Sequence, residues 1–175
     1  MSDAFDTAML ILRIATGLVL FAHGVKHALG REKTTNWFAS IGFKSPQLQW
    51  FASTATELGA GALLALGLIT SVAAAALIGI VFVAFWAVHR TAGFFITSFM
   101  KPGVDVEGWE YVFTLAVIGF VIAIAGPGSF SIDGAIGIAH DLDSWVGLAI
   151  ATAGLLAAIG QVILFYRPAR VGTGA

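Results

Sequence analysis

Apolar residues fill long stretches of the chain, and polar residues gather in the segments between those stretches. A helix that spans a membrane needs about 20 mostly apolar residues, within a range of about 17–25. Five stretches have this length, and they predict spanning helices at residues 7–28, 47–68, 71–90, 108–125 and 144–166. The pattern therefore favours an all-α integral membrane protein, in which the 29–46 loop forms an interfacial helix.

The composition supports this class. The 175 residues are 58% hydrophobic and 11% charged, whereas soluble domains carry about 25% charged residues. A net charge of −1 gives no reason to expect a nucleic-acid partner. The chain has no cysteine, which excludes disulfide exchange, cysteine-ligated iron–sulfur clusters and Cys-based zinc sites. Any redox chemistry must therefore use a bound cofactor or a partner subunit.

Charged residues divide unequally between the two sides of this predicted bundle. The N-terminus and the loop at 126–143 carry acidic residues and no Lys or Arg. The opposite side receives the basic residues Lys26, Arg31, Lys33, Lys44, Arg90, Lys101, Arg167 and Arg170. Because basic loops stay in the cytoplasm, the division predicts an outer N-terminus and a cytoplasmic C-terminus.

Arg13 lies inside the first apolar run, where a charged group is costly and its presence needs an explanation. One interpretation is that its long side chain reaches the outer headgroups. The other is a buried pair with Glu57, which lies roughly 6–8 Å deeper at 1.5 Å per residue. Gly17 and Gly24 share the face of Arg13, and this small-residue face favours packing against another helix.

Glu57 lies near the middle of the second span, followed by Gly59 and Gly61. A carboxyl group at that depth either pairs with a cation or stays protonated. The two glycines would let a neighbouring helix or a flat ligand approach the backbone. We therefore assign Arg13, Glu57, Gly59 and Gly61 to a candidate ligand-binding set.

A second polar group forms near the cytoplasmic ends of three spans. His23, His89 and Glu110 lie at similar depth if the connections between spans are antiparallel. Histidine titrates near neutral pH and can carry protons, so these residues are candidate catalytic groups for the protons of a quinone. Trp86 could contact a flat ring, although aromatic runs more often form core or lipid contacts. For Lys26, Arg90 and Glu107, a ring of interfacial residues is an equally good interpretation.

Two cofactor arrangements are less favoured. His23 and His89 could ligate haem b from facing helices, but neither lies in a recognisable haem-binding context. The outer loop contains Asp133, His140, Asp141 and Asp143. Their spacing matches no metal motif, so we expect a solvated acidic loop and no metal site.

The order and spacing of these residues resemble the DoxX family of small bacterial membrane proteins. The resemblance covers residues 8–135, through Arg13, Gly17, His23-Gly24, Lys26, Glu57-Leu58-Gly59, Gly61, Leu66-Gly67, His89, Glu110, Gly126-Pro127-Gly128 and Ser131-Ile132-Asp133. It implies a four-helix transmembrane bundle at residues 1–135 in the bacterial cytoplasmic (inner) membrane. Residues 136–175 would add an outer loop, a fifth C-terminal transmembrane helix and a short cytoplasmic tail.

The family resemblance also implies a class of function. The DoxX family includes a small subunit of a thiosulfate:quinone oxidoreductase, members of oxidative-stress complexes and membrane chaperones. We therefore expect a membrane-embedded accessory subunit that binds quinone and a redox partner, with a non-catalytic assembly or structural subunit as the alternative. Glycine-rich faces would also permit a homo-oligomer. A transporter is least favoured, because no span is broken in mid-membrane.

Overall fold

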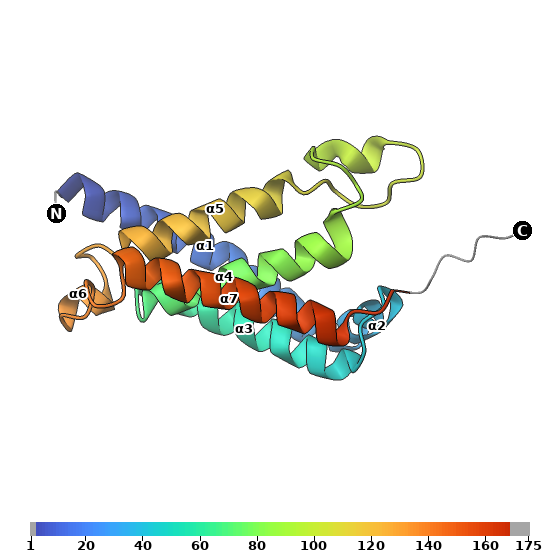
Figure 1. Ribbon diagram of the computed structural model, residues 1–175, viewed down its shortest axis with the longest axis horizontal. Coiled ribbons are helices and arrows are strands. Elements are labelled where there is room, and N and C mark those ends of the chain that lie inside the picture. The colour runs from blue at the N-terminus through green and yellow to red at the C-terminus, as the bar shows by residue number, and fades with distance from the viewer. Residues whose placement is uncertain (1–2, 169–175) are drawn as a thin grey trace, which may run out of the picture.

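The computed structural model describes residues 3–168, and the chain is helical through most of them (Figure 1). The α-helices are α1 (Asp3–Leu29), α2 (Arg31–Ser40), α3 (Pro46–Leu66), α4 (Thr70–Ala84), α5 (Glu110–Ala125), α6 (Ile132–Ala135) and α7 (Ser144–Phe165). A π-helical turn, η1 (Phe85–His89), continues α4, and a 3-10 turn, η2 (Ile96–Met100), lies in the following loop. All five expected apolar segments are helical, and the expected interfacial helix is α2.

Within residues 3–168, three helical segments are long and apolar enough to cross a membrane: Asp3–Leu29, Thr70–His89 and Ser144–Phe165. Glu110–Ala125 is apolar but shorter. Large apolar side chains such as Leu18, Phe113 and Leu156 are exposed on the outside of the bundle. A protein surface in water rarely carries apolar side chains so densely, so this exterior suits a lipid environment.

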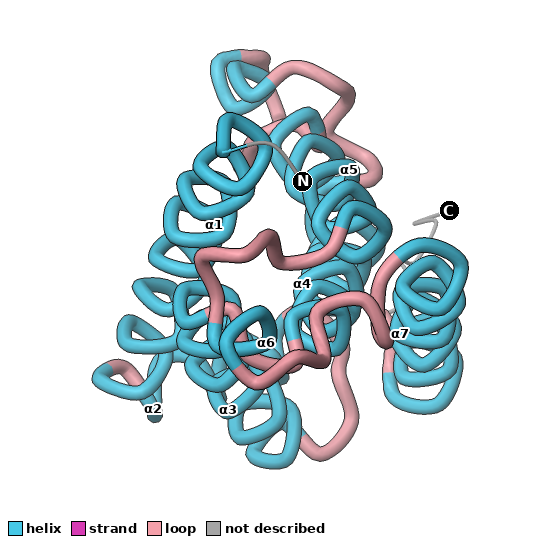
Figure 2. Tube along the Cα trace, turned by 90° about the vertical axis from the view of Figure 1, so that its left-hand side faces the viewer, coloured by secondary structure: helices cyan, strands magenta, loops and turns pink. Residues whose placement is uncertain are grey.

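Helix α4 occupies the middle of the bundle, with α1, α3, α5 and α7 around it (Figure 2). Its buried residues include Ala73, Ala74, Leu77 and Ile78, so its small and aliphatic side chains form much of the core. Helix α7 packs against α4 and α5. It is also joined to α3 by a 2.8 Å hydrogen bond from Gln161 Nε2 to Gln49 Oε1.

Glycines bring α1 and α3 into close contact. A Cβ atom added to Gly61 would lie 2.6 Å from the Phe21 nitrogen and 2.8 Å from the Gly17 carbonyl oxygen. A Cβ at Gly24 would lie 2.8 Å from the backbone nitrogen of Leu58. These distances leave no room for a side chain. The small-residue face of the first helix therefore packs inward, as its spacing predicted.

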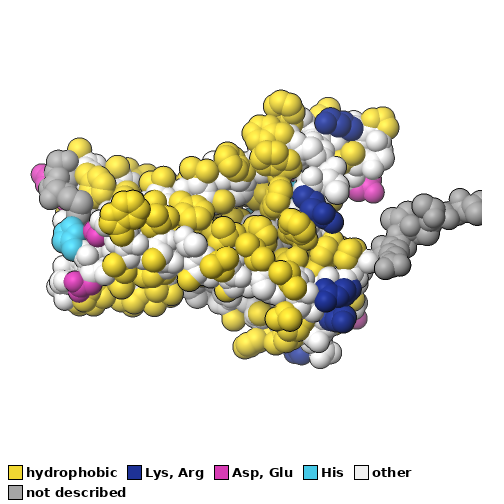
Figure 3. Space-filling model, in the orientation of Figure 1, with side chains coloured by type: hydrophobic (Ala, Val, Ile, Leu, Met, Phe, Trp, Pro, Cys, Tyr) yellow, Lys and Arg dark blue, Asp and Glu magenta, His cyan; other side chains and the backbone are white. Residues whose placement is uncertain are grey.

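Charged side chains concentrate at the two ends of the molecule. Lys and Arg residues gather at the end formed by α2 and the loop before α5, while the opposite end carries acidic side chains and a histidine side chain (Figure 3). This arrangement agrees with the expected division of charge along the chain. Arg170, one of the expected basic residues, lies outside the described residues.

Candidate functional site

Arg13 binds backbone carbonyl groups at the acidic end of the bundle. Its side chain is fully buried, and it donates to the carbonyl oxygens of Leu64 (3.1 Å), Pro127 (2.9 Å) and Phe130 (2.7 Å). It therefore neither reaches the headgroups nor pairs with Glu57, and both sequence-based interpretations of its partner are wrong. The guanidinium group instead fastens the loop after α5 to the end of α3.

The same loop carries Asp133, which is only 2% exposed. Its carboxylate accepts from the backbone N–H groups of Ile69 (2.7 Å) and Thr70 (2.9 Å), and from the Thr70 hydroxyl (2.8 Å). The expectation of a solvated loop is therefore wrong for Asp133, because the loop folds back over the α3–α4 turn. His140 and Asp141 are exposed as expected. Among residues 3–168, no group of three or more His, Asp or Glu side chains could hold a metal ion.

Glu57 pairs with His27 across the α1–α3 interface. The carboxylate is 5% exposed, the imidazole is 20% exposed, and Oε2 lies 2.8 Å from Nδ1. The contact does not have the angles of a well-formed hydrogen bond, so both atoms keep bonding capacity. Sequence reasoning did not identify His27 as a site residue. The signal that could have identified it is its spacing of four residues from His23, which places both on one helix face.

A cavity of about 530 Å³ lies beside this pair, near the basic end of the bundle. We call it the His–Glu cavity, because His23, His27, His89 and Glu57 all line it. Lys26, Glu107 and Tyr111 add further polar groups, and the remaining walls are largely apolar. His23 and His89 thus line one cavity, together with Glu57 rather than Glu110.

Hydrogen bonds determine which ring nitrogen carries the proton in two of these histidines. His23 Nδ1 lies 2.9 Å from the Val19 carbonyl oxygen, and His89 Nδ1 lies 2.8 Å from that of Glu107. A carbonyl oxygen only accepts, so Nδ1 carries the proton in each ring. In the neutral tautomer, Nε2 is then an acceptor that can take a proton from a ligand.

Several expected site residues lie elsewhere. Glu110 begins α5 and does not line the His–Glu cavity. Trp86 also lies outside its lining and has its ring under the Arg90 guanidinium group, 4.9 Å from the ring centroid. Gly59 is exposed and has no neighbour within 4 Å of an added Cβ. Gly61 belongs to the α1–α3 contact.

Comparison with known proteins covers the part of the chain that supplies His23, His27, Glu57 and His89 to the cavity. Residues 8–90 match the DoxX family model. The family resemblance is thereby confirmed over these residues, which include Arg13, His27, Glu57 and His89. The chain is also 36% identical over 72 residues to CatD of Bacillus subtilis (strain 168), a proposed oxidoreductase. That match covers 41% of this chain and 52% of the relative, so the chain spans about half the length of the relative that it matches.

No solved structure matches this chain. Of the residues that bind Arg13, Leu64 lies inside the matched region, whereas Pro127 and Phe130 lie beyond it.

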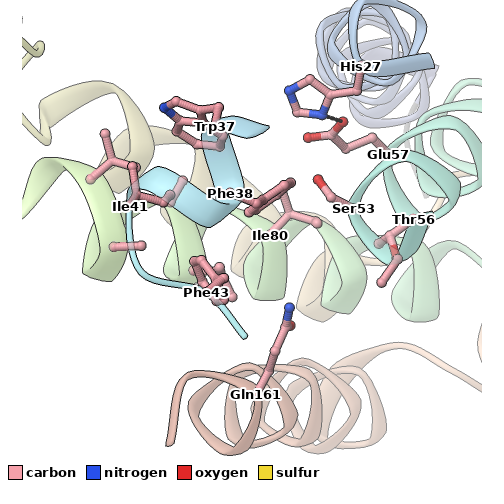
Figure 4. A pocket seen from close by; sticks show the side chains of 15 residues that line it. His27, Trp37, Phe38, Ile41, Phe43, Ser53, Thr56, Glu57, Ile80 and Gln161 are labelled. Carbon is pink, nitrogen blue, oxygen red and sulfur yellow. Dashed lines mark ion pairs between the residues drawn. The ribbon is translucent and has the colours of Figure 1, made fainter. Parts of the chain in front are cut away.

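A smaller chamber of about 110 Å³ adjoins the His–Glu cavity (Figure 4). We call it the aromatic chamber, because Phe38 and Phe43 form part of its wall. His27 and Glu57 line both spaces, and Figure 4 shows their side chains meeting at one side of the chamber. Gln161 enters the opposite side from α7. The ion pair therefore stands on the boundary between the His–Glu cavity and the aromatic chamber.

Proposed function

We propose that this chain is a membrane-embedded accessory subunit of a redox complex, and that it binds a quinone in the His–Glu cavity. The partner is an oxidoreductase of the thiosulfate:quinone or oxidative-stress type, which supplies the electrons. This chain holds the quinone and exchanges its protons. The CatD relationship and the DoxX match support the oxidoreductase association.

The observation that carries the proposal is one cavity with three imidazoles and an intramembrane carboxylate in largely apolar walls. Its volume falls within the usual range of about 300–1,000 Å³ for small-molecule sites. Reduction of a quinone takes up two electrons and two protons, one proton on each carbonyl oxygen. An imidazole can both donate and accept a proton, and His23, His27 and His89 supply three imidazoles to the cavity.

The proposal includes a topology. The chain crosses the bacterial inner membrane five times, with the N-terminus outside and the C-terminus in the cytoplasm. The basic end of the bundle would then face the cytoplasm, and the His–Glu cavity would open toward that side. Proton exchange with the cytoplasm would follow from this orientation.

Purification in mild detergent, with mass spectrometry of co-purifying quinones and proteins, tests this function. We expect bound quinone and an oxidoreductase partner, and reduced quinone turnover by the complex when His89 is replaced by Ala. The control is Trp86→Ala, which alters an aromatic residue outside the cavity. Absence of quinone together with unchanged turnover in His89→Ala would refute the proposal.

The second candidate function is a non-catalytic assembly or structural subunit. It is favoured by the Arg13 contacts, which use an intramembrane charge entirely to hold backbone segments together. On this hypothesis the complex assembles normally when the cavity residues are changed, and it fails only when the bundle is destabilised. Co-purification of a protein partner without any quinone would support it.

A further inference from the structure

A groove on the outside of the bundle runs between α3, α4 and α7. It has a volume of about 450 Å³, and small residues line most of it, including Ala76, Gly79, Gly154 and Ala157. A Cβ added to Gly79 would make only ordinary contacts, at 3.5 Å and 3.6 Å. The groove therefore has room for a chain of methylene or isoprenoid groups along its floor. We call it the α3–α4–α7 groove.

The groove, the aromatic chamber and the His–Glu cavity adjoin one another. Thr56, Ile80 and Gln161 line both the groove and the chamber. His27 and Glu57 line both the chamber and the cavity. The shared residues define a route from the outer surface of the bundle to the ion pair.

We propose that this route holds one amphipathic ligand, whose ring lies at His27–Glu57 and whose hydrocarbon chain lies in the chamber and the groove. This inference rests on the quinone-binding function proposed above and specifies its substrate as a quinone with a long apolar chain. The ligand enters sideways from the bilayer, so its chain stays in apolar surroundings throughout.

Two features of the ion pair favour a ring at this end of the route. The Glu57 side chain is buried, with an exposure of 5%. Its Oε2 atom and His27 Nδ1 lack well-formed hydrogen bonds, and buried polar atoms normally have them. A carbonyl or hydroxyl group on a ring would satisfy this requirement, whereas a hydrocarbon chain would not.

Photolabelling of the full-length chain in phosphatidylethanolamine–phosphatidylglycerol nanodiscs tests the route. One probe is a decyl-benzoquinone with an azide on the ring, and the other carries a diazirine in the chain. We expect the ring probe to label the neighbourhood of His27 and Glu57, and the chain probe to label α4 and α7 beside Gly79 and Ala157. Excess unlabelled decyl-benzoquinone should abolish both signals.

The variant Gly79→Leu fills the groove and should remove most of the chain-probe label. Its matched control is Gly160→Leu on α7, where an added Cβ meets nothing within 4 Å and the label should be unchanged. One outcome overturns this inference alone: unlabelled quinone competes with the ring probe, but the chain probe labels all lipid-facing helices. If excess unlabelled decyl-benzoquinone reduces the labelling by neither probe, the quinone-binding function and this inference are both overturned.

Discussion

The Glu57 carboxylate lies 2.8 Å from His27 Nδ1, and both side chains border the His–Glu cavity and the aromatic chamber. The two residues come from different helices, so their contact depends on the close packing of α1 and α3. Glycines at positions 17, 24 and 61 permit that packing. The position of the candidate ligand site is thus set by residues that do not touch the ligand.

Replacement of Glu57 by Gln tests the chemical role of the pair. Gln keeps the size of the side chain but cannot exchange a proton, so we expect weaker quinone binding and slower turnover by the complex, with little loss of stability. Glu110→Gln is the matched control, because Glu110 does not line the cavity. Equal effects of the two variants on turnover would contradict the assignment of Glu57.

Replacement of Arg13 by Met should destabilise the protein. The change removes the Arg13 donor from the carbonyl groups of Leu64, Pro127 and Phe130. The Leu64 carbonyl still accepts from the Gly67 N–H, whereas a buried group left without a donor costs about 1–3 kcal/mol. Thermal unfolding in detergent should show a clear fall in Tm, whereas Arg31→Met, at an exposed position of α2, should have a small effect. An unchanged Tm for Arg13→Met would contradict the structural role of the guanidinium group.

Asp133 and Thr70 should be energetically coupled. Asp133→Asn places an amide where a carboxylate accepts three hydrogen bonds, and we expect a loss of about 1–3 kcal/mol. Thr70→Ala removes one of the three donors. A double-mutant cycle measured by thermal unfolding should therefore be non-additive. As a control, the exposed Asp141 should show additive behaviour with Thr70→Ala.

The two glycines after Glu57 should respond oppositely to alanine. Gly61→Ala forces a Cβ against the Phe21 backbone, and overpacking of this kind costs about 1–3 kcal/mol. Gly59→Ala meets nothing within 4 Å and should leave the protein intact or slightly more stable. Expression yield and Tm in detergent measure the difference. Equal yields and Tm values for the two variants would show that the α1–α3 contact has room for a side chain at position 61.

The helices and the inward face of α1 could be predicted, because apolar length and glycine spacing are local properties of the sequence. The interfacial position of α2 stays a prediction. His23 and His89 line one cavity, and their common depth in a membrane stays a prediction from the rise per residue in a helix. The partners of Arg13 were not predictable in this way. They are backbone carbonyl groups, one of them at Phe130. Every residue has such a carbonyl, so the sequence does not single out these partners.

The identity of the intramembrane carboxylate partner depends on how α1 and α3 are rotated against each other. Sequence spacing gives the depth of Glu57 but not the direction of its side chain, so Arg13 and His27 were both possible in principle. Contacts that settle such a direction, such as Trp50 Nε1 donating to the His27 carbonyl oxygen at 2.9 Å, form only between helices. The same reasoning explains why Glu110, at a suitable depth, is not part of the cavity.

The π-helical turn at Phe85–His89 gives the end of α4 one residue more than a regular helix would use. A π-helical turn closes its hydrogen bonds over five residues instead of four, so it takes up the additional residue within itself and the chain after it keeps nearly the same rotation about the helix axis. A change of one residue in the length of this turn can therefore be absorbed without turning His89 away from the cavity.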